Sequence, residues 1–522
     1  MISNSTQPRT ATTHGTSLED VDLATGFYHI VNGKRSSHSG RLVVTNPATG
    51  KPLATVPDAS RHVLNSTVAA ARAAFASWSA TPFYERRRQV ASILDKIERH
   101  IEELSLLLTA EQGRPLAGSR WEIEYLTRVY GDGLRRIELP AQTGVLPNFG
   151  RYMKRFTPLG VVCVMCPWNL PVLLSYDAAL PALLAGNTVV LKVSPCAPLT
   201  ALRIADYAKD LLPPGVLNVV TGGSELGSWM ASHPGFDQIT FIGSTRTGRR
   251  VLESAAATLK RVTLELGGND AAIVLADADP DKIAPALFSH MFMLSGQACI
   301  GIKRLYVHER LYPALTAALV AHASRIKTGS GFEPDTILGP VQNELQYRAM
   351  LAWLDRIKRD GTGIAFQGAI PADTGGFFVP PTLLDNPSED APYVRNEVFG
   401  PIRSILRYQT LDEAISRANY SEYGLGASVW GKDLKKLDVV SQRLEAGTVW
   451  INQHSNLHPD LPFGGHKSSG IGVQWGEEGL TAFCNAQVIV GSGLPTFSPG
   501  VGSVKSNTRT GEAASLRPME SF

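Results

Sequence analysis

The sequence predicts an α/β protein with two domains, each built on a parallel sheet. The chain has 522 residues, and this length exceeds the size at which one hydrophobic core usually keeps growing. From residue 160 onward, short apolar runs rich in β-branched residues alternate with longer amphipathic runs. Such alternation is typical of βαβ units. We therefore expect two αβ domains with a cleft between them, beyond the carboxyl ends of the strands.

The individual elements follow from hydrophobic periodicity and turn residues. Two predicted helices come early in the chain, the first rich in Ala and the second long and amphipathic. A series of alternating strands and helices follows from residue 160, and a second such series begins at residue 271. The predicted helices span residues 68–80, 84–113, 177–185, 199–211 and 224–232. The predicted strands span residues 160–166, 188–193, 216–220, 238–242, 271–275, 304–307 and 448–452.

Both ends of the chain are polar and lack periodicity. We expect residues 1–25 to form a flexible arm, and residues 495–522, rich in Pro, Gly, Ser and Thr, to form a disordered tail. The first residues contain no apolar run of the kind found in secretory signals, and the Arg repetition of a transit peptide is missing. The expected location is the cytoplasm.

Composition excludes several classes of function. The net charge is +3 and no run of Lys or Arg suggests a nucleic-acid partner. The longest apolar stretch, residues 159–174, is too short and too interrupted by proline to span a membrane. Five cysteines argue against a disulfide framework. Cys163 and Cys166 lie in an apolar run that reads as a buried strand, so we expect no metal site.

Two segments follow predicted strands in positions where a ligand could bind. The run Gly243 to Gly248 lies between a strand and a helix expected to begin near Arg249, where glycines and free N–H groups can approach a phosphate. A plain strand–turn–helix corner would use the same glycines. Glu265 lies in an apolar run, so burial should raise its pKa toward that of a general base. A structural glutamate bound by backbone N–H groups is the alternative.

Two further residues could carry nucleophilic chemistry. Cys299 is flanked by small residues and is accessible to a ligand, whereas most single cysteines are inert core residues. To react at neutral pH, its thiol needs a lowered pKa. Asn169 stands between Pro167 and Pro171, directly after a predicted strand. Its amide could donate to a developing oxyanion, or the segment could be only a rigid turn.

Taken together and in this order, these segments resemble the aldehyde dehydrogenase superfamily, from about Gly26 to Val490. Seven segments carry the resemblance: Pro167 to Pro171, Lys192 to Pro195, Phe241 to Thr245, Glu265 to Gly268, Gly296 to Cys299, Glu397 to Pro401 and Pro462 to Gly465.

The resemblance implies a role for each of three catalytic residues. Cys299 would attack the aldehyde carbon and form a thiohemiacetal. Asn169 and the backbone N–H of Cys299 would hold the oxyanion. After hydride transfer, Glu265 would activate the water that hydrolyses the thioester, which implies the acid-forming branch and not the CoA-acylating one.

The same resemblance implies a nicotinamide dinucleotide cofactor and a small aldehyde substrate. Lys192 would hold the adenosine ribose, Gly243 and Ser244 the pyrophosphate, and Glu397 and Phe399 the nicotinamide ribose and ring. Trp168 and Leu266 are assigned to the same cofactor site. An acidic residue that often rejects NADP in this family is replaced by Pro195, so we expect NAD without excluding NADP.

The resemblance also implies Rossmann-like domains and an oligomer. Residues 26–149 and 159–265 would form the dinucleotide-binding domain and residues 266–479 the catalytic domain. Residues 150–158 and 480–494 would form a small β arm that joins subunits into a homodimer or homotetramer.

The sequence is weighed against two other functions. The first is a non-catalytic relative, which would have no reason to retain Cys299, Glu265 and Asn169 together. The second is a simple thioester hydrolase, which would not need a cofactor site. The aldehyde is not identified. Polar residues before Pro462, from His454 to Asp460, suggest a substrate channel with polar character, although loops are polar by default and these residues could simply be solvated.

Overall fold

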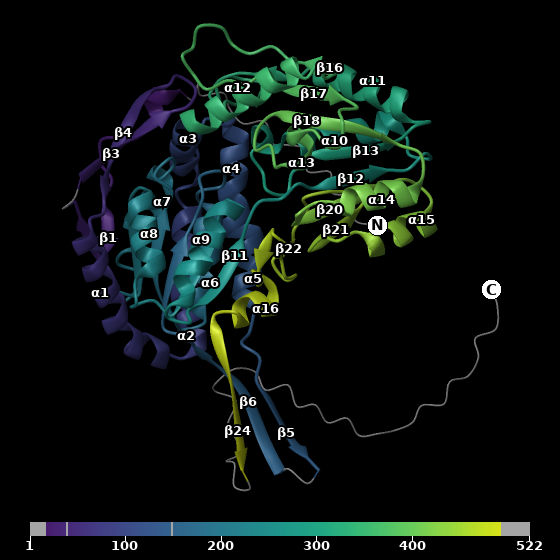
Figure 1. Ribbon diagram of the computed structural model, residues 1–522. Helices are drawn as coiled ribbons and strands as arrows, with labels where there is room; N and C mark the ends of the chain where they lie inside the picture. Colours follow the sequence, from purple (N-terminus) through teal and green to yellow (C-terminus); the bar gives the residue numbers. More distant parts are fainter. Residues whose placement is uncertain (1–16, 38–39, 148–149, 492–522) are drawn as a thin grey trace.

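The computed structural model describes residues 17–37, 40–147 and 150–491, and two large sheets organise it (Figure 1). The first has eight strands in the order β2 (Lys34–Ser36), β1 (His29–Val31), β9 (Leu217–Thr221), β8 (Thr188–Val193), β7 (Val161–Met165), β10 (Gln238–Ile242), β11 (Arg261–Glu265) and β23 (Gly470–Ile471). Its five central strands are parallel, and β1, β2 and β23 run antiparallel to their neighbours.

The second sheet has seven strands. Their order is β16 (Ile364–Gln367), β17 (Thr382–Asp385), β18 (Ile402–Tyr408), β13 (Arg304–His308), β12 (Ala271–Val274), β20 (Gly426–Trp430) and β21 (Thr448–Ile451). All neighbours are parallel except β16 and β17. The predicted α/β fold with two mainly parallel sheets is confirmed.

Helices cover both faces of each sheet. Successive side chains of a strand point to opposite faces, and the apolar side chains on each face form a separate core with the helices that cover it. On the first sheet, one face packs against α2 (Phe83–Glu98), α3 (Ile101–Gln112), α6 (Leu173–Leu184) and α7 (Leu199–Ala208), and the other against α1 (Arg61–Ala80), α8 (Ser224–Ser232) and α9 (Thr245–Ala256). On the second sheet, α12 (Glu344–Arg359), α14 (Leu411–Asn419) and α15 (Leu434–Arg443) lie opposite α10 (Pro280–Phe292) and α11 (Tyr312–Ala323).

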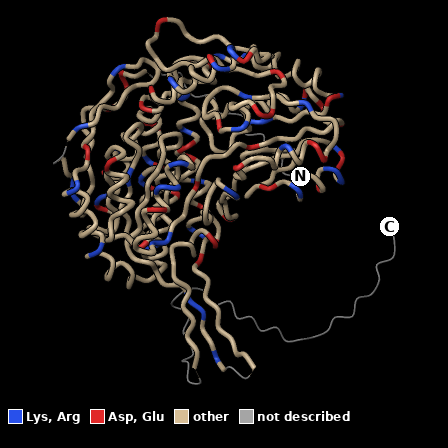
Figure 2. The backbone as a smooth tube through the Cα atoms, in the orientation of Figure 1, with Lys and Arg blue, Asp and Glu red and all other residues tan. Residues whose placement is uncertain are grey.

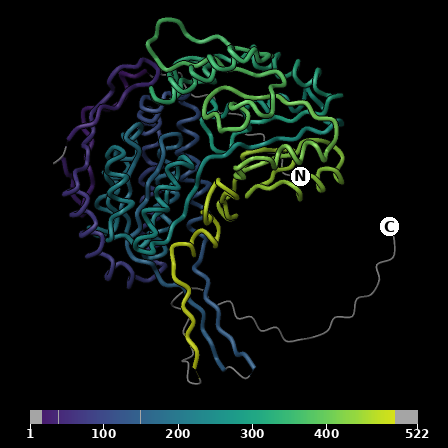
Figure 3. Tube along the Cα trace, in the orientation of Figure 1, coloured from purple at the N-terminus to yellow at the C-terminus, as the bar shows by residue number. Residues whose placement is uncertain are grey.

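A three-stranded sheet extends from this body as an arm. Its order is β24 (Cys484–Gly491), β6 (Gly150–Pro158) and β5 (Gln142–Leu146). Figure 3 shows the yellow C-terminal strand beside the blue strands, and Cys484 pairs with Pro158 across more than 300 residues of sequence. The predicted boundaries differ here, since β5 belongs to the arm instead of the first domain, and β23 belongs to the first sheet instead of the second domain.

The remaining elements are short. They are the pairs β3 (Gly40–Asn46) with β4 (Lys51–Asp58), β14 (Lys327–Thr328) with β15 (Thr336–Leu338) and β19 (Tyr423–Gly424) with β22 (His466–Lys467), the helices α4 (Leu116–Glu124), α5 (Gly131–Arg136), α13 (Pro392–Arg395) and α16 (Gly476–Thr481), and the turns η1 (Leu18–Asp20), η2 (Tyr125–Tyr130) and η3 (Met293–Gly296). Within the described residues, no helix has both the length and the apolar character needed to cross a membrane.

Several predicted boundaries differ for local reasons. The expected helix over 84–113 is divided into α2 and α3 at His100, whose ring packs on Tyr207 at 4.3 Å between centroids. Helix α9 begins at Thr245 and not near Arg249, because the Ser244 side chain caps the helix by accepting from Thr247 N–H.

The expected terminal segments are only partly described. Residues 17–25 of the expected flexible arm hold η1, and Asp22 forms an ion pair of 3.1 Å with Arg203. Residues 1–16, the end of the β arm beyond Gly491 and the expected tail lie outside the described residues.

Charged residues are distributed without a single-sign stripe along the described backbone in Figure 2. One ion pair is different because it is buried. Arg114 and Glu122 pair in the interior, with side chains 3% and 0% exposed. The second oxygen of Glu122 accepts from the N–H groups of Val172 and Leu173, at 2.8 Å each, where α6 begins. This carboxylate satisfies free N–H groups at the start of the helix and fixes the segment that follows Asn169.

We expect Glu122→Gln to destabilise the protein by about 3 kcal/mol, because it leaves the Arg114 charge buried without its partner. Thermal or urea unfolding measures this. The matched control is Glu124→Gln on the same helix, since Glu124 pairs with Arg128 at a partly exposed site, and such pairs contribute about 0–1 kcal/mol. Equal losses in the two variants would contradict the assignment.

Candidate active site

The predicted site residues come together where the carboxyl ends of the parallel strands meet the second sheet. A cleft of about 680 Å³ is lined by nine of them. They are Trp168, Asn169, Gly243, Ser244, Glu265, Leu266, Cys299, Glu397 and Phe399. The tenth, Lys192, is outside this lining and lies near the end of β8.

Cys299 follows a strained loop that the sequence did not reveal. Leu294, Ser295 and Gly296 all have positive φ angles, of 54°, 55° and 77°. The left-handed region disfavours side chains such as that of Leu294, so surrounding contacts must hold the loop. Ser295 Oγ donates to Gly339 O at 2.9 Å, and Gln297 Oε1 accepts from Gln342 N at 2.9 Å.

A buried arginine also holds this loop. The Arg403 guanidinium is 1% exposed and donates to Gly296 O at 2.7 Å and Met291 O at 2.6 Å. It also donates to Val398 O at 3.0 Å and Gly400 O at 2.8 Å, on either side of Phe399. Arg403 therefore joins the loop before the nucleophile to the loop that carries Glu397 and Phe399.

The Cys299 thiol lies in an apolar setting. Burial raises its pKa to about 12, and the Lys303 ammonium opposes this shift. Lys303 donates to the carbonyl of Cys299 and lies 3.6 Å from Glu397 Oε1. The lowered pKa that reaction at neutral pH requires is therefore absent in the protein alone. Lys303 belongs to none of the motifs found in the sequence, and its role near the thiol is evident only from its position in the structure.

Asn169 and Glu265 face the same space from the first sheet. Asn169 Nδ2 donates to Gln297 O at 3.0 Å, which orients the amide. Glu265 ends β11 and is 5% exposed. Its Oε1 has no hydrogen-bond partner among the described residues, and burial raises its pKa well above the usual range, with the nearby Asp177 adding to the effect. The direction of this shift agrees with the expectation from sequence.

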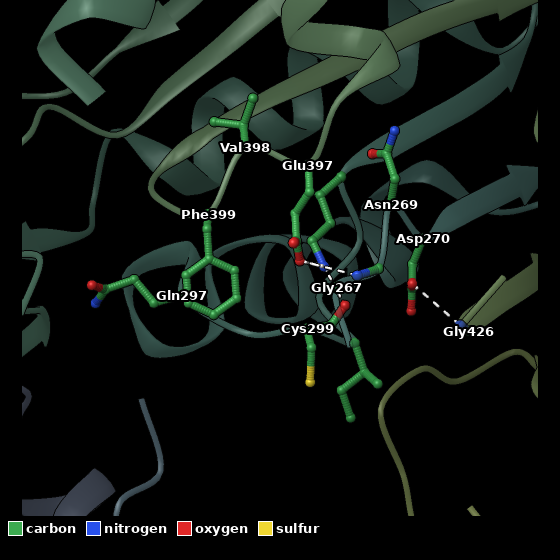
Figure 4. Close-up of polar contacts among 12 residues, drawn as sticks. Gly267, Asn269, Asp270, Gln297, Cys299, Glu397, Val398, Phe399 and Gly426 are labelled. Carbon is green, nitrogen blue, oxygen red and sulfur yellow. Dashed lines mark hydrogen bonds and ion pairs between the residues drawn. The ribbon is translucent and has the colours of Figure 1, made fainter. Parts of the chain in front are cut away.

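Glu397 and Phe399 extend from one loop, and Glu397 points toward the segment around Gly267 that connects β11 to β12 (Figure 4). Glu397 Oε1 accepts from Gly268 N–H at 3.1 Å. The Phe399 ring meets Trp168 edge to face at 5.5 Å between centroids. Gln346, which the sequence did not single out, donates to Phe399 O at 2.6 Å and lines the cleft.

The remaining predicted cofactor residues have features that fit a bound dinucleotide. Gly243 and Ser244 lie at the start of α9, where free N–H groups can bind phosphate. Lys192 is buried, which lowers the pKa of its ammonium to about 8, and the described residues offer it no hydrogen bond or ion pair. A buried cation without a partner needs a polar ligand, and ribose hydroxyls would provide one.

A second cavity, of about 1040 Å³, meets the first at Asn169, Glu265 and Cys299. Its walls are mostly apolar, with aromatic rings from distant segments. These rings belong to Trp121, Tyr125, Phe463 and Trp475.

The predicted polar character of this channel is largely wrong. Of the polar loop, Ser455 and Asn456 line the cavity. His454 is buried and its Nε2 contacts Ile300 O at 2.8 Å, while His458 and Asp460 are outside the lining. The sequence could not place these side chains because the loop folds back on Ile300.

Comparison with known proteins agrees with this geometry. Residues 34–489 match the model of the aldehyde dehydrogenase family. An aldehyde dehydrogenase of a Fusarium species is 36% identical over 476 residues, covering 89% of this chain and 98% of the relative. Phenylacetaldehyde dehydrogenase of Pseudomonas fluorescens is 37% identical, covering 86% of this chain and 92% of the relative.

Solved structures are similar as well. A variant of aldehyde dehydrogenase C from Pseudomonas syringae, in complex with NAD⁺ and octanal, superposes with a TM-score of 0.85 at 34% identity. The match covers 91% of this chain and 99% of that one.

The raised pKa of Cys299 leads to a test on the protein without cofactor. A thiol with a pKa of about 12 is neutral near pH 7, and its thiolate fraction rises about tenfold for each pH unit. We expect the rate of alkylation by iodoacetamide to rise by that factor per unit from pH 7 to 9, with Cys299→Ala giving the background of the other cysteines. A plateau below pH 8 would mean that the protein alone already activates the thiol.

Proposed function

The chain belongs to the aldehyde dehydrogenase family and is an NAD(P)-dependent oxidoreductase, and we propose that Cys299, Glu265 and Asn169 carry out its oxidation of an aldehyde to a carboxylic acid. The observation that supports these roles is the convergence of the three side chains at the junction of the two cavities. One cavity is lined by six of the seven predicted cofactor residues, and the other is an apolar channel of about 1040 Å³.

The first step is attack on the aldehyde carbon by Cys299 as the thiolate, after its thiol proton has been released to water. A carbon–sulfur bond forms and the carbonyl oxygen becomes an oxyanion. One hydrogen of Asn169 Nδ2 is engaged with Gln297 O, which leaves the second free to donate to the oxyanion. The backbone N–H of Cys299 makes no hydrogen bond to the described residues and provides the second donor.

A nicotinamide dinucleotide, when bound, supplies the acceptor for the hydride that leaves the tetrahedral carbon. We propose that Glu397 holds the ribose beside the nicotinamide ring, and that Trp168, Leu266 and Phe399 position the ring. The α9 N-terminus with Gly243 and Ser244 would hold the pyrophosphate, and Lys192 the adenosine ribose. The similar Pseudomonas syringae enzyme binds NAD⁺, and we expect NAD to be the preferred cofactor here.

Glu265 then acts on the thioester. Its unpartnered Oε1 is available to accept a proton from water, the water oxygen attacks the acyl carbon, and the Cys299 sulfur leaves. Because burial raises the pKa of Glu265 well above the usual range, the basic carboxylate form increases as the pH rises. Hydrolysis should therefore become faster toward alkaline pH.

We propose that the part of the chain carrying the eight-stranded sheet binds the cofactor, whereas the part carrying the seven-stranded sheet supplies the nucleophile. We also propose a cytoplasmic location. All five cysteines are free, and free thiols suit a reducing compartment.

We propose that the β arm joins subunits into a homodimer or homotetramer. Among the described residues, no strand pairs with the outer edge of β24 in the three-stranded sheet, and Val488 and Val490 on this strand are 59% and 45% exposed. Unpaired edges and exposed apolar side chains favour association with a second chain.

Glu265→Gln separates the two chemical steps. We expect one equivalent of NADH per active site in a rapid burst, followed by turnover slowed by about 10²–10⁴-fold, because the thioester forms but loses its base. Stopped-flow absorbance and mass spectrometry of the acyl-enzyme measure this. Cys299→Ala is the control and should give no burst. Rapid steady turnover of Glu265→Gln would show that another group activates the water.

The double change Val488→Asp and Val490→Asp should shift the protein toward a monomer of 56.3 kDa, because paired charges on the arm oppose burial at an interface. Light scattering after size-exclusion chromatography measures the mass. Val439→Asp, at an exposed site on α15 away from the arm (Figure 1), is the control. An unchanged oligomer in the double variant would contradict a role of β24 in assembly.

A further inference from the structure

The substrate channel contains two buried polar groups that the chemistry above does not use. The first is the carboxyl of Asp177, on α6, which is 1% exposed and lines the channel. Its Oδ2 accepts from the indole N–H of Trp475 at 3.1 Å. Its Oδ1 has no hydrogen-bond partner among the described residues.

The second group is the side-chain amide of Gln474, which is 5% exposed and lines the same channel. The backbone of Gln474 is fixed, since its N–H and C=O both pair with Phe463 at 2.8 Å. The side-chain Nε2 has no partner among the described residues. The channel therefore holds an unpaired carboxyl oxygen and an unpaired amide donor.

An unpaired buried polar group is unfavourable by about 1–3 kcal/mol, so these two groups fit a ligand that satisfies both. A hydroxyl group is the smallest that can donate one hydrogen bond and accept another. An ammonium group would satisfy Asp177 and leave Gln474 without an acceptor. The rings of Trp121, Tyr125 and Phe463 around them fit an apolar body.

Resting on the proposed function, we propose that the substrate is an apolar aldehyde with a hydroxyl group on its distal part. The hydroxyl accepts from Gln474 Nε2 and pairs with Asp177 Oδ1, donating to it when the carboxyl is ionised and accepting from it when the carboxyl is protonated. Asp177 is in this view a specificity-determining residue, while Cys299, Glu265 and Asn169 perform the reaction on any aldehyde that reaches them.

The position of the indole supports this role. The Trp475 ring lies 6.3 Å from Tyr125, 5.6 Å from Tyr130 and 6.2 Å from Phe463, between ring centroids. Contacts with three aromatic rings restrict the indole, and its N–H holds Asp177 Oδ2. The free Oδ1 is therefore held in place before a substrate enters, which reduces the entropy lost on binding.

The test compares alkanals with ω-hydroxyalkanals of the same length, from four to ten carbons. We expect kcat/KM to favour the hydroxylated aldehyde by at least about tenfold at one length, because only one length brings the hydroxyl to Asp177. Asp177→Leu should abolish this preference. Asp177→Asn, which retains an oxygen acceptor for Trp475, should keep part of it, and Gln474→Met should weaken it severalfold.

Oxidation of plain alkanals by the variants shows that they fold. Because Asp177 also acts on the pKa of Glu265, the preference is measured within each variant, as the ratio of kcat/KM for the hydroxyalkanal to that for the alkanal of the same length. Ser455→Ala is the matched control, since Ser455 lines the same channel but its hydroxyl already donates to Ile300 O at 2.9 Å, so the hydroxyl preference should not change. The proposal is overturned if no length shows a preference, if the preference survives in Asp177→Leu, or if ω-aminoalkanals are favoured over hydroxyalkanals. In each of these cases the wild type still oxidises alkanals, so the proposed function is retained and only the proposal on the hydroxyl group fails. A wild type that oxidises no aldehyde would overturn both proposals.

Discussion

The buried guanidinium of Arg403 links the two loops on which the active site depends. It comes from a central strand of the second sheet and donates to carbonyls before Cys299 and on either side of Phe399. A charged group in the interior is tolerated only where its donors are satisfied, so these carbonyls must remain where they are. The nucleophile loop and the loop of Glu397 cannot move independently, and the strained Leu294 and Ser295 conformations are held as a result.

Burial is the second constraint on the site, and it shifts the pKa values of several titratable groups near the sulfur. It raises the pKa of Cys299 to about 12 and that of Asp177 to about 8, and it raises the pKa values of Glu265 and Glu397 as well. A site in which these side chains are buried favours their neutral forms until a ligand changes the balance of charge. Lys303, which lies between Cys299 O and Glu397, is the cation that opposes this tendency.

The two cavities have different chemical character because they are built from different parts of the chain. The cofactor cleft lies at the carboxyl edge of the first sheet, where strand ends place Asn169, Gly243 and Glu265 side by side. The substrate channel takes its walls from η2, α6 and the segment around Trp475, which share no local pattern. Residues that act on the reacting atoms therefore occur in motifs, whereas residues that surround the substrate do not.

The sequence alone determined the α/β class and the parallel strands, because strand periodicity is a local property and parallel strands bring their carboxyl ends to one edge. Through the resemblance of its motifs to the aldehyde dehydrogenases it also indicated nine residues of the cleft. Tertiary structure alone decided three features. They are the apolar character of the channel, the hydrogen bonds by which Arg403 joins two loops, and the unpaired oxygen of Asp177. Each of these depends on contacts between segments far apart in sequence, such as Asp177 with Trp475 or Arg403 with Gly296. Whether a polar side chain is solvated, paired or left for a ligand is settled by burial, and burial is a property of the packed molecule.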